Sequence, residues 1–253
     1  MNLDSRLAIQ YNIFFNFNGD MMSKGLFVLG TGTDIGKTYV TGLLLKYLRD
    51  NGYDATYFKA ALSGAIRDEN GNLIPGDAVE VLTMAGLEED TDFLVPYIYE
   101  TAVSPHLASH IEGNPVDLEK VRKSYDEVSK KYDYIVMEGS GGIVCPIRYE
   151  GKGNDNNIML EDIIKFLDLD VILIADAGLG TINSIVTTVE YLKNRNIHVC
   201  GIIMNNYKDE LMENDNIKMV EDLCDVDVIA KVYQNDKNLQ PNVDIKELIS
   251  YFK

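Results

Sequence analysis

The sequence has no tryptophan, only three cysteines and three histidines, and far fewer positive than negative charges. The cysteines Cys145, Cys200 and Cys224 are far apart and odd in number, so they indicate neither a disulfide framework nor a zinc ribbon. His106 and His110 are four residues apart, but two ligands without a third acid nearby rarely make a metal site. The formal net charge is −17. So acidic a surface repels nucleic-acid phosphates and anionic lipid heads, and neither is expected as a partner.

Long apolar runs are also missing, since none reaches the roughly 18 residues that a membrane-spanning helix needs. Residues 1–20 have neither a basic start nor a small-residue cleavage site, which argues against a signal peptide. We expect this stretch to be an atypical N-terminal extension, followed by a single domain over residues 21–253. The expected location is the cytoplasm.

Short apolar runs alternate with stretches of helical periodicity along the chain. We expect strands at residues 25–30, 55–59, 134–138, 170–175, 198–205 and 228–232. We expect helices at residues 37–50, 77–84, 116–131, 160–167, 183–194, 217–223 and 245–252. The strands are apolar throughout, which is typical of strands buried on both faces. The sequence therefore predicts an α/β fold with a doubly wound, mostly parallel sheet, helices on both faces, and ligands at the carboxyl ends of the strands.

A phosphate-binding loop is the strongest chemical signal. The segment Gly30-Thr31-Gly32-Thr33-Asp34-Ile35-Gly36-Lys37-Thr38 lies between the first expected strand and the first expected helix, as such a loop requires. Its backbone N–H groups and the helix N-terminus attract phosphate oxygens. Lys37 is expected to reach the β- and γ-phosphates, and the Thr38 hydroxyl to hold Mg²⁺. Thr31 stands where the usual pattern has glycine.

Three further charged residues fall where a ligand of this loop would lie. Lys59 follows the second strand, Asp77 begins a helix, and Glu138 ends the third strand. Lys59 is a candidate phosphate or substrate contact, or a solvated lysine. Asp77 is either a magnesium ligand or a helix cap. Glu138 occupies the place of the acid that lies beside magnesium in P-loop enzymes, or merely precedes a glycine-rich turn.

Several motifs together resemble the dethiobiotin synthetase family, in that family's order, over about residues 24–235. They lie at residues 30–38, 59–64, 77–78, 104–106, 138–142 and 180–183. The resemblance implies a fold of the P-loop NTPase type and an ATP- and Mg²⁺-dependent ligase of biotin biosynthesis. In the implied reaction, CO₂ adds to one amine of 7,8-diaminononanoate, ATP phosphorylates the resulting carbamate, and the second amine attacks the mixed anhydride. Dethiobiotin, ADP and phosphate result.

The resemblance also implies residue roles. Lys37 and Lys59 are the implied catalytic residues, and Thr38, Asp77 and Glu138 are the implied magnesium ligands. The implied nucleotide contacts are Thr33, Asp34, Ile35, Gly36, Lys37, Thr38 and Asn205. The implied substrate contacts are Thr33, Lys59, Ser63, Ser140, Gly141, Gly142 and Asn183.

Two of these roles belong to asparagines far from the loop in the sequence. Asn205 would read the adenine edge, and Asn183, at a helix N-terminus, would hold the far carboxylate of the substrate across the interface of a homodimer. The chain departs from the family pattern at Gly32 and at Asn206, where the family usually or often has aspartate, and at Ala60, where a proline is common.

Two other classes of P-loop protein are the alternatives. Regulatory ATPases of the partition or division-site type carry an extra lysine at the position of Gly32, and this chain has neither that lysine nor a basic membrane-binding tail. Amidotransferases of the same superfamily normally add a glutaminase domain with a nucleophilic cysteine. The chain is too short to hold such a domain, and Cys145 lacks a suitable neighbourhood.

Overall fold

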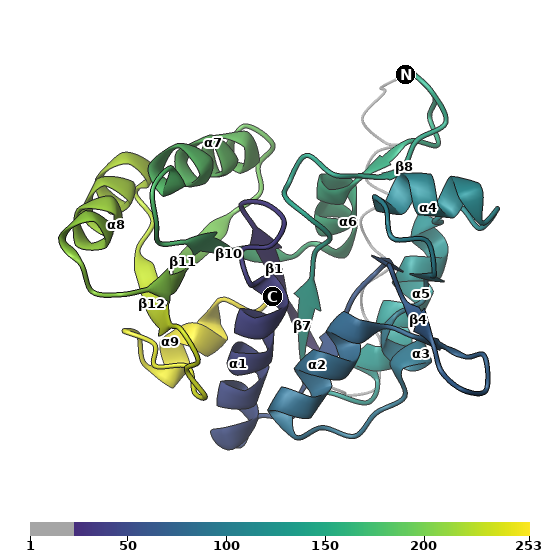
Figure 1. Cartoon of the computed structure of the whole chain (residues 1–253), viewed down its shortest axis with the longest axis horizontal. Helices are drawn as coiled ribbons and strands as arrows, with labels where there is room; N and C mark the ends of the chain where they lie inside the picture. The colour runs from purple at the N-terminus through teal and green to yellow at the C-terminus, as the bar shows by residue number, and fades with distance from the viewer. Residues whose placement is uncertain (1–22) are drawn as a thin grey trace, which may run out of the picture.

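In the computed structural model, which describes residues 23–253, six strands form one central sheet (Figure 1). The strands lie in the order β12-β11-β10-β1-β7-β2, and every neighbouring pair is parallel. Their bounds are β1 (Lys24–Gly30), β2 (Ala55–Phe58), β7 (Tyr134–Glu138), β10 (Asp170–Asp176), β11 (Val199–Tyr207) and β12 (Val228–Tyr233). The predicted parallel α/β sheet is thereby confirmed.

Burial explains why these segments form the sheet. Residues Leu26 to Leu29 of β1 are all fully buried, and so are those from Val171 to Ala175 of β10. Successive side chains of a strand point to opposite faces, so a strand buried along its whole length must be covered on both faces. The chain runs from β1 to one edge of the sheet and later returns to the other side of β1, so the carboxyl end of β1 is the point where ligands bind in such sheets.

Helices fill the connections between the strands. The first, α1, packs against β1, β2 and β7, and α7 packs against β10 and β11. The bounds of the longer helices are α1 (Lys37–Asp50), α2 (Gly76–Ala85), α5 (Leu118–Ser129), α6 (Leu160–Leu167), α7 (Thr181–Lys193) and α8 (Leu211–Cys224). The shorter α9 (Ile245–Ser250) follows the last strand. Each of these helices overlaps a predicted one, although α8 begins six residues before its predicted start at 217.

The sequence pattern does not predict the shorter elements. Two-residue strands carry no periodicity, and within the described residues the short strands pair only with one another, in three small sheets. They are β3 (Leu62–Ser63), β4 (Ile66–Arg67), β5 (Leu73–Ile74), β6 (Ile98–Tyr99) and β9 (Ile158–Met159), with the three-residue β8 (Pro146–Arg148). The short helices α3 (Thr91–Leu94) and α4 (Pro105–Ile111) are likewise new.

The expected N-terminal extension, residues 1–20, lies outside the described residues. Within residues 23–253, no helix combines the length and the apolar character that crossing a membrane demands.

Candidate active site

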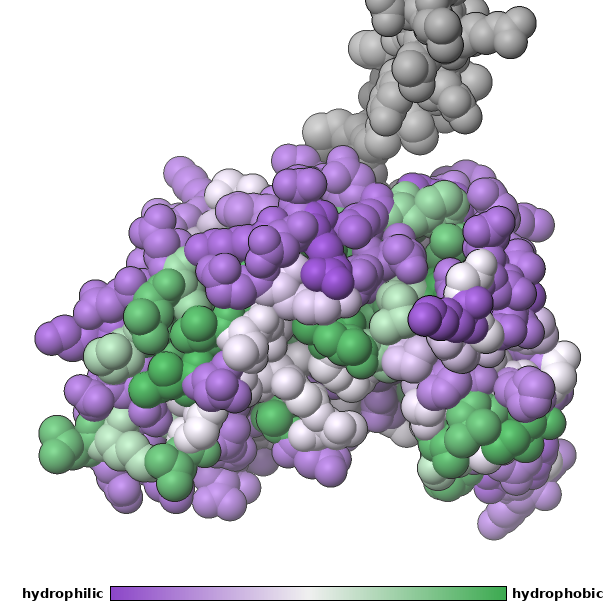
Figure 2. Space-filling view, turned by 90° about the horizontal axis from the view of Figure 1, so that it is seen from above, coloured by the Kyte–Doolittle hydropathy of each residue, from purple (hydrophilic) through white to green (hydrophobic). Residues whose placement is uncertain are grey.

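The phosphate-binding loop leaves the carboxyl end of β1 and enters α1, at the upper side of the sheet in Figure 1. Figure 2 looks down on this side and shows a mixed surface, with hydrophilic side chains between separate apolar patches. Gly36 is the N-cap of α1 and has a left-handed backbone, with φ 79°. An added Cβ at Gly36 would lie 2.2 Å from Nδ2 of Asn205, which itself donates to the carbonyl of Ile35 at 2.8 Å. Asn205 therefore supports the loop from β11, a contact that its predicted role as an adenine reader did not include.

We expect Gly36→Ala to destabilise the protein and to weaken ATP binding. A left-handed backbone costs a residue with a Cβ about 1–2 kcal/mol, and the contact with Asn205 adds to this. Thermal unfolding and the KM for ATP measure the two effects. Gly32→Ala in the same loop is the matched control, because its Cβ would meet no atom within 4 Å. Equal stability and KM in the two variants would contradict the structural role of Gly36.

A charged cluster lies beside the loop, where four elements meet. Nζ of Lys59, just after β2, lies 3.0 Å from Oε1 of Glu138 at the end of β7 and 2.5 Å from Oδ2 of Asp77 in α2. The Thr38 hydroxyl donates to Oε1 of Glu138 at 3.0 Å, and the Tyr57 hydroxyl donates to Oε2 at 3.0 Å. Lys59 is 4% exposed and Glu138 1% exposed. The structure thus brings together the lysine, both acids and the threonine that the sequence singled out.

The two lysines of the site have opposite pKa shifts. Burial alone would lower the pKa of Lys59, but the charges of Glu138 and Asp77 and their hydrogen bonds outweigh burial, so the pKa is raised. For Lys37, burial lowers the pKa and the charge of Lys59 lowers it further, while Glu138 and Asp77 oppose both. Lys59 is therefore held firmly as an ammonium ion, so it cannot serve as a base near neutral pH.

The cluster also has the donor set of a hard divalent cation. Asp77 does not cap α2, since the N-cap is Pro75 and the Asp77 carboxylate turns to Lys59. Two carboxylates therefore converge on the Lys59 ammonium, and the Thr38 hydroxyl donates to one of them, Glu138. Oxygen ligands of this kind suit Mg²⁺. The residues present fit the ion.

The predicted substrate contacts divide into two groups. The hydroxyl of Ser63 donates to the carbonyl of Val103 at 2.6 Å, and that of Ser140 donates to the carbonyl of Ala61 at 2.9 Å. The turn after β7 lies against the phosphate-binding loop, because a Cβ on Gly142 would be 3.3 Å from the carbonyl oxygen of Thr31. By contrast, Asn183 is exposed in the first turn of α7.

A hollow of about 270 Å³ adjoins the other side of the loop. It combines residues of the loop and of α1 with the ends of β11 and β12 and the segment after β12. The lining residues are Asp34, Gly36, Tyr39, Asn205, Asn206, Tyr233, Gln234 and Asn235. Sequence reasoning did not single out Tyr39, although it directly follows the loop motif. It also missed Tyr233, Gln234 and Asn235, because no motif or spacing connects them to the loop, and only the parallel pairing of β11 with β12 places them there.

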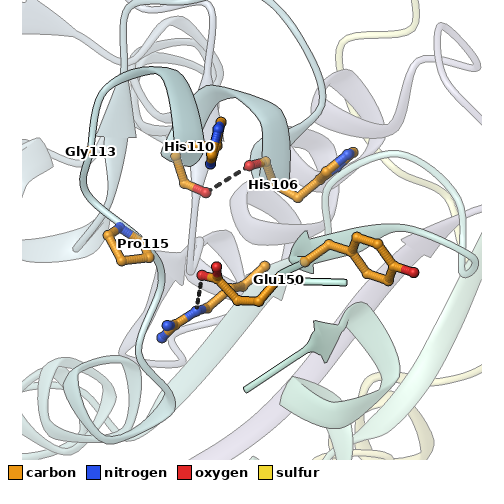
Figure 3. A pocket seen from close by; sticks show the side chains of 8 residues that line it. His106, His110, Gly113, Pro115 and Glu150 are labelled. Carbon is orange, nitrogen blue, oxygen red and sulfur yellow. Dashed lines mark hydrogen bonds and ion pairs between the residues drawn. The ribbon is translucent and has the colours of Figure 1, made fainter. Parts of the chain in front are cut away.

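A smaller hollow of about 100 Å³ lies between α4 and the end of β8 (Figure 3). His106 and His110 line it, but their rings do not converge in Figure 3. Across the hollow, Arg148 and Glu150 form an ion pair with each other at 2.9 Å. Because its charged groups already satisfy one another, we do not include this hollow in the candidate site.

The chain is similar to known proteins over most of its length. A family model described as an AAA domain matches residues 24–242. The ATP-dependent dethiobiotin synthetase BioD of Clostridium novyi (strain NT) is 52% identical over 232 residues, which cover 91% of this chain and 94% of that protein. The protein of the same name from Clostridium perfringens (strain 13 / Type A) is 49% identical over 212 residues, covering 83% and 91%.

Among solved structures, the MinC:MinD cell division protein complex of Aquifex aeolicus superposes with a TM-score of 0.52 at 16% identity, covering 85% of this chain and 83% of that chain. At this identity the likeness shows the fold alone. That fold is the predicted P-loop NTPase type.

Proposed function

The chain belongs to the ATP-dependent dethiobiotin synthetase family, and from this premise we propose that the cluster around Glu138, with the phosphate-binding loop, is its active site. The protein is an ATP-dependent ligase that forms dethiobiotin in biotin biosynthesis, with ATP and diaminononanoate as substrates. The observation that carries the assignment is the Lys59 ammonium held between Asp77 and Glu138, directly beside Thr38 of the loop. We place the enzyme in the cytoplasm.

The two lysines supply positive charge at different points. Lys37 begins α1 and neutralises charge on the phosphoryl group as it is transferred, because phosphoryl transfer depends mainly on positioning and electrostatics. Lys59 stabilises the carbamate that CO₂ forms with the first amine, and then the phosphorylated carbamate. Its raised pKa suits this role, since a permanent ammonium ion is needed and no proton has to be given up.

Thr38, Asp77 and Glu138 would hold Mg²⁺ through their oxygen atoms. The bound ion supplies positive charge to the phosphate oxygens of ATP. Glu138 cannot turn away readily, because the buried Tyr57 hydroxyl holds its second oxygen. The site thus keeps one carboxylate fixed and leaves the more exposed Asp77 to adjust.

The serines are suited to bind the diamine end of the substrate. A hydroxyl has one donor hydrogen and two acceptor lone pairs. The hydrogens of Ser63 and Ser140 are already given to backbone carbonyls, so their lone pairs remain to accept from amine N–H groups. Thr33 and the backbone of Gly141 and Gly142 complete the substrate contacts that we propose.

A homodimer would complete the site with Asn183 of the partner subunit, at the N-terminus of α7, where a helix favours a carboxylate. Apolar side chains on the same side of the sheet support an interface there. Leu179, just ahead of α7, is 93% exposed, and Leu107, Ile111 and Val144 are also exposed. Apolar patches are visible between the hydrophilic side chains on this side in Figure 2.

The direct test of function is phosphate release from ATP with Mg²⁺ and bicarbonate, measured with and without 7,8-diaminononanoate. We expect release to depend on the diamine and a product with the mass of dethiobiotin to accumulate with it. Equal release without the diamine, and no product, would instead match a regulatory ATPase with the same fold.

The shared site predicts complementation between two inactive variants. Lys37→Ala and Asn183→Asp should each be nearly inactive alone, the second because an added carboxylate repels the substrate carboxylate at the helix end. Mixed in equal amounts and allowed to exchange subunits, they should regain about a quarter of the wild-type rate, because half of the dimers are mixed and each has one complete site. Recovery would be absent if each subunit supplied its own Asn183. Light scattering on each variant and on the mixture tests whether dimers are present.

A further inference from the structure

A second group of ligating side chains lies at the amino ends of the strands, at the end of the sheet opposite the phosphate-binding loop. Asp170 begins β10, His198 directly precedes the neighbouring β11, and Cys200 is the second residue of β11. Nδ1 of His198 is 3.1 Å from Oδ2 of Asp170. One nitrogen, one sulfur and one oxygen ligand atom all lie within 4.8 Å of one another.

An irregularity in the sheet positions Cys200. Val171 pairs with Val199 and Ile172 pairs with Gly201, so Cys200 is an extra residue in β11 with no partner in β10. Such a bulge changes the direction of a side chain relative to a regular strand. Here it places the Cys200 sulfur, 3.2 Å from the carbonyl oxygen of Val171, on the same side as Asp170 and His198.

We propose that Asp170, His198 and Cys200 bind one divalent metal ion of the zinc type, at a site separate from the active site. Imidazole, thiolate and carboxylate are the ligands that Zn²⁺ takes, and three protein ligands leave a fourth position for water. The active-site cluster offers only oxygen atoms and selects harder ions such as Mg²⁺. The bound ion would link β10 to β11 at the amino ends of the strands, away from the active site.

One group competes with the metal for Asp170. Nζ of Lys253 lies 2.6 Å from Oδ1 of Asp170 and 3.5 Å from Oδ1 of Asp168. The Lys253 side chain is 44% exposed, so it can turn to water, whereas its backbone is fixed by two hydrogen bonds to Gly25. Lys253→Gln would therefore remove the competing charge without disturbing the backbone.

Cobalt provides the test, because a Co²⁺–thiolate bond gives a charge-transfer band in the near ultraviolet that oxygen ligands do not give. We expect one equivalent of Co²⁺ to produce this band in the untagged full-length protein. Cys200→Ser should abolish the band and weaken Co²⁺ binding by more than about tenfold, since losing only an outer-shell partner costs roughly 10–100-fold. Cys145→Ser and Cys224→Ser are the matched controls and should keep the band.

Lys253→Gln gives a test in the opposite direction. We expect it to bind Co²⁺ more tightly than the wild type, because the ammonium no longer occupies Asp170. Thermal unfolding without metal checks that each variant folds. The proposal is overturned if the wild type shows no band, if the band survives in Cys200→Ser, or if Lys253→Gln binds no more tightly.

Discussion

Replacing Lys37 with alanine should lower the rate of dethiobiotin formation by roughly 10²–10³-fold, the loss typical when one preorganised charge-stabilising group is removed from an active site. Lys37 is partly buried, and burial together with the nearby Lys59 charge lowers its pKa. An ammonium ion held in such surroundings is poorly solvated, so it gains more from a transferring phosphoryl group than a solvated lysine would. The fall should appear in kcat, because the interaction is strongest in the transition state.

A lysine on the same helix provides the control. Lys46 lies in α1 but reaches outward to Asp50 and Asn238. Exposed ion pairs of this kind contribute little, so Lys46→Ala should change neither kcat nor stability appreciably. Rates measured by product mass at saturating ATP separate the two variants. A Lys37→Ala enzyme with the full rate would remove Lys37 from the catalytic residues.

The sequence predicts the central sheet well because each strand is a continuous apolar run. The strand at 134–138 and the helices at 37–50 and 160–167 agree with the structure at both ends. The predicted start of α8 at residue 217 is too late. Four of the six residues before Ile217 in α8 are polar, so the helical spacing of apolar residues becomes recognisable only from Ile217. Apart from α2, the elements between β2 and α5 are not predicted, since two-residue strands and helices of one or two turns have too few residues to show a period.

For the site, sequence motifs predict residues that lie at the ends of strands, but they do not predict contacts that depend on how distant segments pair. The loop, Lys59 and Glu138 follow directly from strands, so their meeting was predictable. The support of Glu138 by Tyr57 was not, because Tyr57 looks like any apolar strand residue. The bulge at Cys200 is not predicted by any sequence pattern either, because it arises only from the pairing of β11 with β10.

Glu138→Gln should reduce both the stability of the protein and its response to Mg²⁺. The glutamine keeps the shape but, among residues 23–253, leaves the buried Lys59 with Asp77 as its only carboxylate partner. Breaking a buried ion pair typically costs about 3–5 kcal/mol of stability. Because Asp77 remains, we expect the free energy of unfolding, measured with urea, to fall by about 3 kcal/mol. Catalysis should fall at the same time, and more Mg²⁺ should be needed to reach half of the residual rate.

Asp77→Asn separates the two effects. It removes one negative charge from the same cluster, but the Asp77 side chain is 42% exposed, so Lys59 loses a partner that water can partly replace. We therefore expect a similar increase in the Mg²⁺ requirement with a clearly smaller loss of stability. If Glu138→Gln lost stability but kept the wild-type Mg²⁺ dependence, Glu138 would serve to hold Lys59 in place rather than to bind the metal. The difference between these two carboxylates follows from burial, because a buried acid must neutralise its lysine even when no metal is bound.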